Sequence, residues 1–353
     1  MRKASTGSSI PCRSRREELL VCAPNWLGDA VMATPFLFAL RRRLPEASIT
    51  VFCRSYAAEV FRRCRASDSL VTYEKQNVWA RISAITARIP RTGYDACFVL
   101  PPSFSSAFVS LFCRARKRIG YGGNGRSALL TDVVSASRYR ATHLSNAYVR
   151  LLERLTGEQE GDIPLPVVVP PASWEETVRR ISNGKSYFVL APGAVYGSSK
   201  VWPYERFAAL ATRLVARTGW MPVIVGRGEE RAGVSALIEA AGVEGTNCAG
   251  TLSLAELVSV LRGSGVTIGN DSGPVHISAA LGRPTVAIFG PSSAAWTAPR
   301  GCAVRIVTGE ADCAPCFKRE CPRGEAVCLL RVHVDDVYRE TCSLIEGVHR
   351  EQA

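Results

Sequence analysis

The chain has 353 residues, 47% of them hydrophobic and 21% charged, which is enough for two globular domains with separate cores. No uncharged apolar run approaches about 18 residues, so no membrane-spanning segment is expected. The net charge is +13, and residues 1–170 carry most of the excess, with 25 Lys and Arg against 13 Asp and Glu, which favours an anionic partner.

The first half predicts a leader followed by an α/β domain. Residues 1–17 are polar and basic, without an apolar segment behind Arg2 and Lys3, so we expect a disordered leader rather than a secretion signal, and a cytoplasmic chain. In residues 18–170, short apolar runs alternate with amphipathic segments, which predicts a parallel sheet covered by helices. Expected strands are residues 19–23, 48–53, 69–73 and 95–100, and expected helices are residues 30–43 and 78–89.

Residues 163–171 include four prolines and predict a stiff, extended linker to a second domain, residues 171–331. The same alternation restarts there, and residues 332–353 predict a closing helix. Expected strands are residues 187–191, 221–226, 265–269 and 285–289, and expected helices are residues 203–217, 229–241, 253–262 and 274–281. Two doubly wound, Rossmann-like α/β domains in series would face each other across a central cleft at the carboxyl ends of their strands.

The loop after the first strand, residues 23–29, is the first candidate site. Gly28 permits a tight turn, and Asp29 falls where the helix begins. The ordinary interpretation of such an aspartate is a helix N-cap. Because the loop lies at the carboxyl edge of the sheet beside Trp26, Asp29 could instead take a proton from an attacking hydroxyl group. The loop lacks a GxGxxG motif, which disfavours a dinucleotide-binding first domain.

Two loops of the second half carry charged residues suited to a nucleotide. The loop at residues 191–203 places Lys200 after small residues, which suits a diphosphate but lacks the spacing of a Walker A motif. Glu229 follows another predicted strand and could accept hydrogen bonds from ribose hydroxyls. The alternative for Lys200 is an ordinary surface loop that binds no phosphate. The alternative for Glu229 is an acidic residue in the first turn of a helix, which occurs without any ligand.

The third candidate site is the loop at residues 269–276. The backbone N–H groups of Ser272 and Gly273 would point out of a helix N-terminus, where unsatisfied donors and the helix dipole attract phosphate. Asp271 and His276 share this loop and could take part in binding. The alternative for Asp271 is a helix N-cap, and the alternative for His276 is a buried, hydrogen-bonded histidine of the core.

The cysteine cluster contains Cys313, Cys316, Cys321 and Cys328 within sixteen residues. Four thiolates could close a structural zinc site, although the spacing is not that of a standard finger. Two disulfides or four reduced thiols are the alternatives. A catalytic metal is not expected, because four thiolates would leave no open coordination position for a substrate.

Together these features resemble the bacterial lipopolysaccharide heptosyltransferases of glycosyltransferase family 9, in particular the heptosyltransferase II branch. The matching motifs are residues 24–32, 200–203 and 270–276, and the cysteine cluster resembles a segment of that branch. The resemblance spans roughly residues 18–345. It implies a GT-B fold, with an N-terminal acceptor domain and a C-terminal donor domain facing a central cleft.

The resemblance also implies the reaction: inverting transfer of L-glycero-D-manno-heptose from ADP-heptose to the first heptose of a Kdo–lipid A core, with no cofactor for catalysis. By motif position Asp29 would be the general base and Lys200 would bind the diphosphate. Further donor-binding residues would be Asp271, Ser272, Gly273 and His276, with Glu229 as a weaker candidate, and acceptor-binding residues would be Asn25, Trp26 and Arg118.

The implied acceptor is an anionic glycolipid, which suits the basic first half. The resemblance therefore implies an enzyme in the cytoplasm, in peripheral contact with the inner face of the inner membrane. No nucleic acid is expected as a partner. The nearest alternative is another family 9 transferase that adds the first or third heptose. A non-enzymatic nucleotide- or RNA-binding protein is suggested by the pI of about 9.4, but no RNA-binding motif supports it. A nucleotide-sugar epimerase or hydrolase of the same shape is a third alternative.

Overall fold

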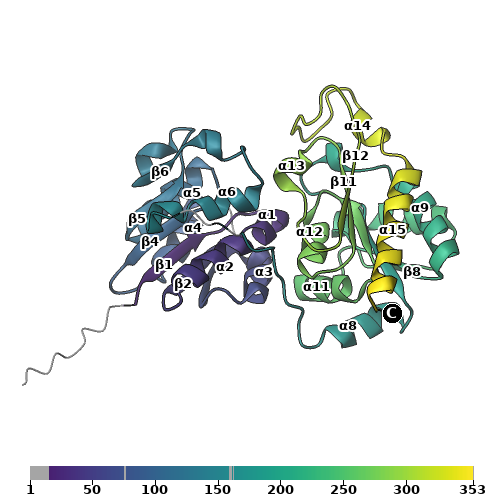
Figure 1. Ribbon diagram of the computed structural model, residues 1–353, viewed down its shortest axis with the longest axis horizontal. Helices are drawn as coiled ribbons and strands as arrows, with labels where there is room; N and C mark the ends of the chain where they lie inside the picture. Colours follow the sequence, from purple (N-terminus) through teal and green to yellow (C-terminus); the bar gives the residue numbers. More distant parts are fainter. Residues whose placement is uncertain (1–15, 75–76, 159–160, 162, 353) are drawn as a thin grey trace, which may run out of the picture.

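The computed structural model describes residues 16–74, 77–158, 161 and 163–352, so nearly all of the predicted leader lies outside the described residues. The chain forms two α/β units that lie side by side, each built on a six-stranded sheet (Figure 1). All strand pairs within both sheets are parallel. The two doubly wound sheets expected from the sequence are therefore confirmed.

The first unit has the strand order β3-β2-β1-β4-β5-β6. Its strands are β1 Glu18–Cys22, β2 Ser48–Arg54, β3 Ser69–Tyr73, β4 Tyr94–Val99, β5 Ala115–Tyr121 and β6 Asp132–Val134, and its α-helices are α1 Leu27–Met32, α2 Thr34–Arg43, α3 Ala58–Cys64, α4 Val78–Thr86, α5 Phe104–Ser110, α6 Leu144–Arg150 and α7 Glu153–Thr156. Alternate side chains of β1 enter different cores: Leu19 belongs to one and Leu20 to the other. Helices therefore cover both faces of this sheet.

The helix predicted at residues 30–43 is two helices, α1 and α2. Ala33 separates them, and Pro35 lies in the first turn of α2. A proline cannot donate the backbone hydrogen bond to the residue four positions earlier, which here is Val31. The hydroxyl of Thr34 donates to the Val31 carbonyl instead, at 2.8 Å. The separate helix α1 contacts α12 of the second unit.

Strands β5 and β6 were missed by the sequence analysis. β5 begins inside the basic cluster, where Arg116 and Lys117 are exposed, and its continuous buried stretch starts only at Ile119. Its apolar run is therefore too short to stand out from the surrounding charges.

The second unit has the strand order β12-β11-β10-β7-β8-β9. Its strands are β7 Tyr187–Ala191, β8 Met221–Ile224, β9 Thr246–Asn247, β10 Thr267–Asn270, β11 Thr285–Phe289 and β12 Val304–Thr308, and its α-helices are α8 Trp174–Ser182, α9 Tyr204–Thr218, α10 Arg231–Ala241, α11 Leu254–Gly263, α12 Gly273–Ala280, α13 Ala294–Thr297, α14 Val327–Leu330 and α15 Val334–Gln352. The closing helix expected after residue 331 is α15, which contacts α9, β11 and β12. No helix in the described part of the chain is long and apolar enough to cross a membrane.

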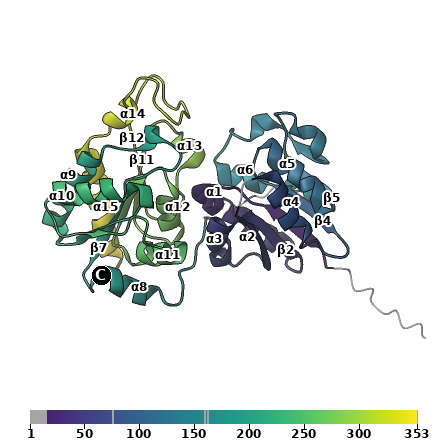
Figure 2. The ribbon, with the colours of Figure 1, turned by 180° about the vertical axis from the view of Figure 1, so that it is seen from behind.

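The two units meet where α1 contacts α12, which both views of the ribbon show at the boundary (Figures 1 and 2). The proline-rich segment 163–171 contains no helix or strand. The backbone N–H of Val168 donates to Ala280 of the second unit, and that of Val169 donates to Arg63 of the first. This connecting segment is thus hydrogen-bonded to both units.

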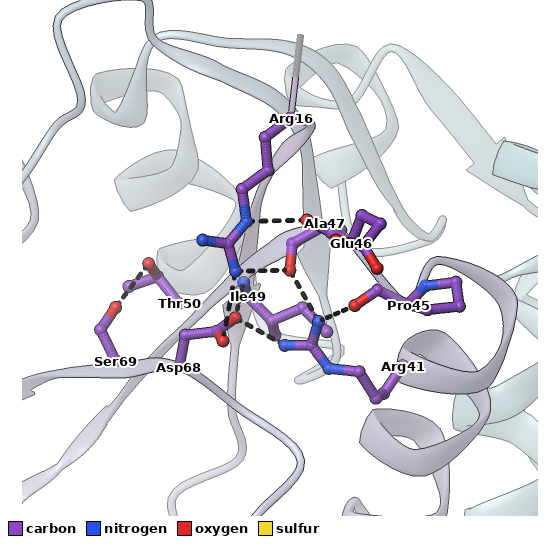
Figure 3. A network of polar contacts seen from close by, with 9 residues as sticks. All are labelled: Arg16, Arg41, Pro45, Glu46, Ala47, Ile49, Thr50, Asp68 and Ser69. Carbon is purple, nitrogen blue, oxygen red and sulfur yellow. Dashed lines mark hydrogen bonds and ion pairs between the residues drawn. The ribbon is translucent and has the colours of Figure 1, made fainter. Parts of the chain in front are cut away.

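A polar network fixes the amino-terminal ends of β1 and β2 (Figure 3). The carboxylate of Asp68 accepts from the Ile49 backbone at 2.7 Å and from Arg41 at 2.5 Å. Burial would raise the pKa of Asp68, but these donors outweigh burial and lower it. Arg16 donates to the Glu46 carbonyl at 2.7 Å. Arg16, which the sequence analysis assigned to the leader, is therefore bound to the first unit.

Candidate functional site

A cavity of about 620 Å³ lies between the two units. The first unit contributes α1 and the residues that follow β2, while the second contributes the segments that follow β7, β8, β10 and β11. Each of these segments lies at the carboxyl end of a parallel strand, where ligands of doubly wound sheets bind. The predicted site residues that line the cavity are Trp26, Asp29, Lys200, Asp271, Ser272, Gly273 and His276.

Two glycines let the units approach closely at the cavity. A Cβ atom on Gly28 of α1 would lie 2.9 Å from the His276 ring, and one on Gly273 of α12 would lie 2.6 Å from Leu27. Both distances are shorter than Cβ contacts in real proteins, so a side chain at either position would force His276 or Leu27 to move. Because neither glycine has a side chain, the first turns of α1 and α12 can lie close together.

Asp29 lies in the first turn of α1 and does not cap it. The N-cap position belongs to Trp26, whose side chain makes no capping hydrogen bond. Burial raises the pKa of Asp29 to about 6. Electrostatic interactions with His276 and Lys200 lower the pKa of Asp29 and so oppose the rise, and the interaction with Asp271 adds to it. A carboxyl group with such a pKa is mostly ionised at neutral pH yet basic enough to accept a proton.

Asp271 and Lys200 form a buried ion pair opposite Asp29. The ammonium of Lys200 donates to Asp271 Oδ2 at 2.5 Å, and the hydroxyl of Ser292 donates to the same oxygen at 2.6 Å. His276 Nε2 lies 3.6 Å from Asp271 Oδ1. Burial alone would raise the pKa of Asp271, but His276 and Lys200 outweigh it and lower the pKa to about 2. Asp271 is thus a permanent anion that holds Lys200 in place, rather than the N-cap that its position suggested.

Asn270 joins two loops of the site, a role that the sequence analysis missed. Its side-chain amide is fully buried, donates to the Pro192 carbonyl at 2.5 Å and accepts from the Trp202 backbone at 3.2 Å. These bonds tie the end of β10 to both ends of the Lys200 loop. An amide at the end of an apolar strand was the available signal, since buried polar groups require partners.

Ser272 is the N-cap residue of α12 but makes no side-chain capping bond. Its hydroxyl is buried and has no hydrogen-bond partner among the described residues. The N-terminus of α12 itself opens into the cavity, since Ser272, Gly273 and Pro274 all line it. Unpaired donors of this kind suit an anionic ligand.

The structure places Glu230 at the cavity, where the sequence analysis expected Glu229. The Glu229 side chain is 70% exposed and pairs with Arg227 at 2.8 Å. Glu230 turns inward, where its Oε2 accepts from the Arg227 backbone at 2.8 Å. Gly193 leaves the space that Glu230 occupies, because a Cβ there would lie 2.1 Å from its carboxylate.

Of the three acceptor-binding candidates, only Trp26 lines the cavity, and it is 41% exposed. Asn25 lies beside it, and its Oδ1 accepts from the Tyr73 hydroxyl at 2.7 Å. Arg118 does not reach the cavity. It lies at mid-strand in β5, and its guanidinium donates to the Leu129 carbonyl at 3.0 Å. The placement of Arg118 at the site was wrong because its strand was not recognised.

The cysteine cluster does not form a metal site. Cys313, Cys316, Cys321 and Cys328 are all free thiols, ranging from exposed to buried. Within the described ranges, no three or more His, Cys, Asp or Glu side chains are grouped to hold a metal ion. The structure therefore supports neither zinc nor disulfides there.

The cysteine-containing loop instead braces the loop that carries Lys200. Phe317 accepts at its carbonyl from the Tyr196 hydroxyl at 2.6 Å, and Lys318 accepts from the Ser199 hydroxyl at 2.5 Å. Gly197 packs against the backbone of Arg319, where a Cβ atom would lie 2.1 Å from the carbonyl oxygen.

The sequence and the structure of this chain are similar to those of known proteins. The family model of glycosyltransferase family 9 (heptosyltransferase) matches residues 82–327. Lipopolysaccharide heptosyltransferase 2 of Escherichia coli K12 is 27% identical over 310 residues, which cover 83% of this chain and 89% of that protein. Lipooligosaccharide heptosyltransferase 2 of Haemophilus influenzae is 28% identical over 313 residues, with the same coverage. The solved structure of E. coli ADP-heptose lps heptosyltransferase II has a TM-score of 0.79 at 24% identity, covering 95% of this chain and 100% of that one.

These similarities confirm the GT-B arrangement and the family resemblance seen in the motifs. They also set aside the alternative of a non-enzymatic RNA-binding protein. The chain is a glycosyltransferase and belongs to family 9, the heptosyltransferases.

Proposed function

We propose that the chain transfers L-glycero-D-manno-heptose from ADP-heptose to the first heptose of the lipopolysaccharide inner core, with inversion at the transferred carbon. The observation that carries the proposal is the cavity, in which the Asp29 carboxylate of one unit faces Lys200 and the N-terminus of α12 in the other. The relatives named heptosyltransferase 2 support the choice of the second heptose, and the ADP-heptose in the name of the E. coli structure supports the donor.

The second unit would bind the donor. The diphosphate would accept from Lys200, from the N-terminus of α12 and from the unpaired Ser272 hydroxyl. Asp271 would repel phosphate, so its role would be to orient Lys200 rather than to touch the donor. Glu230, in place of Glu229, would accept hydrogen bonds from ribose hydroxyls.

The first unit would bind the acceptor and activate it. An acceptor hydroxyl attacks the anomeric carbon as its proton passes to Asp29, and the bond from that carbon to the diphosphate oxygen breaks. The charge that develops on ADP is met by Lys200 and the helix N-terminus. A single displacement inverts the anomeric carbon. We assign no cofactor to this reaction.

The proposed base predicts an acidic limb in the pH–rate profile. Because ionised Asp29 is the active form and its pKa is about 6, kcat/KM should fall about tenfold per pH unit below that value. His276 lowers the pKa of Asp29, so His276→Gln should move the limb to higher pH. Steady-state rates between pH 5 and 8 test both. A limb that disappears in His276→Gln would assign the titration to the histidine instead.

An acceptor panel decides which sugar is added. Purified protein would be given ADP-heptose with Kdo-terminated and with singly heptosylated acceptors. Turnover on the heptosylated acceptor alone is expected, whereas turnover on the Kdo-terminated acceptor alone would indicate a first-heptose transferase. Turnover only on an acceptor that already carries two heptoses would indicate a third-heptose transferase. Consumption of the donor without any acceptor would favour an epimerase or hydrolase. Because the proposed acceptor is anchored in lipid, we place the enzyme in the cytoplasm at the inner face of the inner membrane.

A further inference from the structure

A second contact joins the two units where α6 begins. His143 Nε2 donates to the Ala298 carbonyl at 2.9 Å, and the Arg300 guanidinium donates to Asn146 Oδ1 at 2.8 Å. His143 and Asn146 belong to α6 and its N-cap, whereas Ala298 and Arg300 follow α13 of the second unit. Both views of the ribbon show α6 and α13 on the facing sides of the two units (Figures 1 and 2). The reaction proposed above gives this contact no role.

Arg140 of the first unit extends the contact to two aromatic rings of the second. Its guanidinium lies over the Trp296 ring, 4.9 Å from the centroid, and over the Phe317 ring, 5.1 Å from the centroid. A cation over the face of an aromatic ring is attracted by the ring electrons. Trp296 and Phe317 line the cavity, but Arg140 does not. Arg140 can therefore act on the site through these rings rather than by touching a substrate.

Phe317 is connected to both members of the buried ion pair. Its carbonyl accepts from the Tyr196 hydroxyl at 2.6 Å, and Lys200 Nζ lies 4.9 Å from the centroid of the Tyr196 ring. The Phe317 backbone N–H donates to the Pro291 carbonyl at 2.8 Å. The residue after this proline is the serine whose hydroxyl donates to Asp271. A shift of Phe317 would therefore be felt on the Lys200 side and on the Asp271 side.

The backbone of Phe317 needs outside support. Its φ angle is 54°, in the left-handed region that residues other than glycine seldom adopt. It lies in residues 309–326, which contain no helix or strand. A conformation of this kind persists only where the surrounding structure holds it. The Trp296 ring, at 5.8 Å between centroids, and the Arg140 guanidinium supply that support from the side chain.

We propose that Arg140 is a positioning residue of the donor site. Its guanidinium, which belongs to the first unit, holds Phe317 and thereby the loop on which Lys200 meets the diphosphate. The inference rests on the proposed function in one respect, namely that the cavity binds a nucleoside diphosphate. The first unit thus contributes to donor binding by a residue that contacts no substrate.

Hydrogen exchange tests the positioning without any ligand. The backbone amides of residues 199–201 each donate a hydrogen bond. In Arg140→Ala they should exchange about 5- to 30-fold faster, because the loop opens without breaking two cation–π contacts. Arg140→Lys keeps the charge and should recover part of the protection. Arg138→Ala removes an exposed arginine of the same segment and is the matched control, which should exchange like wild type. Arg140 is itself exposed, so its replacement leaves no buried gap.

Calorimetric titration with ADP relates the loop to the donor. ADP should bind Arg140→Ala about three- to tenfold more weakly than wild type, with Arg140→Lys in between. At saturating ADP-heptose, turnover by Arg140→Ala should stay within about twofold of wild type, because a bound donor orders the loop and the lost free energy appears in KM.

The exchange and binding results decide two separate questions. Unchanged exchange at residues 199–201 in Arg140→Ala would overturn the positioning role, as would faster exchange combined with wild-type affinity for ADP. Faster exchange spread over the whole second unit would show a general loss of stability and would overturn it as well. Wild-type protein that does not bind ADP would refute the proposed function, while the exchange rates still decide whether Arg140 holds the loop.

Discussion

Asp29→Asn is expected to lower kcat by about 10²- to 10⁴-fold while leaving the affinity for ADP-heptose close to that of wild type. The amide keeps the size and polarity of the carboxyl group but cannot accept the proton of the attacking hydroxyl. Donor contacts belong to the other unit, so binding should persist. Single-turnover rates and calorimetric titration with the donor measure the two quantities separately. Near-normal turnover would remove Asp29 as the base.

The same substitution should stabilise the fold at neutral and alkaline pH, which distinguishes loss of a base from loss of structure. The folded-state pKa of Asp29 lies above its ordinary value of 3.8, so the folded chain pays for ionisation as pH rises from about 4 to about 6 and carries the full cost above that range. Asparagine carries no such cost. We expect a gain of about 1–3 kcal/mol in the free energy of unfolding at pH 8, shrinking toward zero near pH 4.

Denaturant unfolding at both pH values measures this gain. Asp312→Asn, at an exposed position, is the matched control and should change neither stability nor turnover. A loss of stability in Asp29→Asn at pH 8 would mean that the carboxylate makes favourable contacts that outweigh its burial. The lower activity could then not be assigned to the missing base alone.

Much of the fold could be predicted because both sheets are parallel and covered on both faces. Strands such as β7 and β11 are fully buried, and such strands appear as uninterrupted apolar runs. An edge strand such as β12, and β5 next to an edge, escape this rule. β12 alternates exposed and partly buried residues, and β5 starts among arginines, so neither has a long apolar run to recognise.

The site could be predicted at the level of loops but not of individual contacts. Sequence places Asp29, Lys200 and Asp271 after strands, and parallel topology then brings them to one cavity. Which of two adjacent glutamates turns inward depends on Gly193, a residue distant in sequence that leaves room for Glu230. The pairing of Lys200 with Asp271 likewise depends on a loop braced by the segment around Phe317. Neither dependence has a local signature.

Lys200→Ala is expected to weaken ADP-heptose binding by about 10- to 100-fold, because a charge-assisted contact to the diphosphate is lost. It should also destabilise the fold by on the order of 2 kcal/mol, since Asp271 is left as a buried anion without its cation. Lys185→Ala removes an exposed lysine paired with Glu244 and is the control for both measurements.

Adding Asp271→Asn to Lys200→Ala separates the two effects of the lysine. The double variant no longer buries an unpaired carboxylate, so most of the lost stability should return. Donor affinity should stay low, because the ammonium that would meet the diphosphate is still missing. Recovery of affinity together with stability would show that Lys200 acts only by neutralising Asp271. Persistently weak binding in a stable double variant would instead place the lysine at the phosphates, with Asp271 as the group that holds it there.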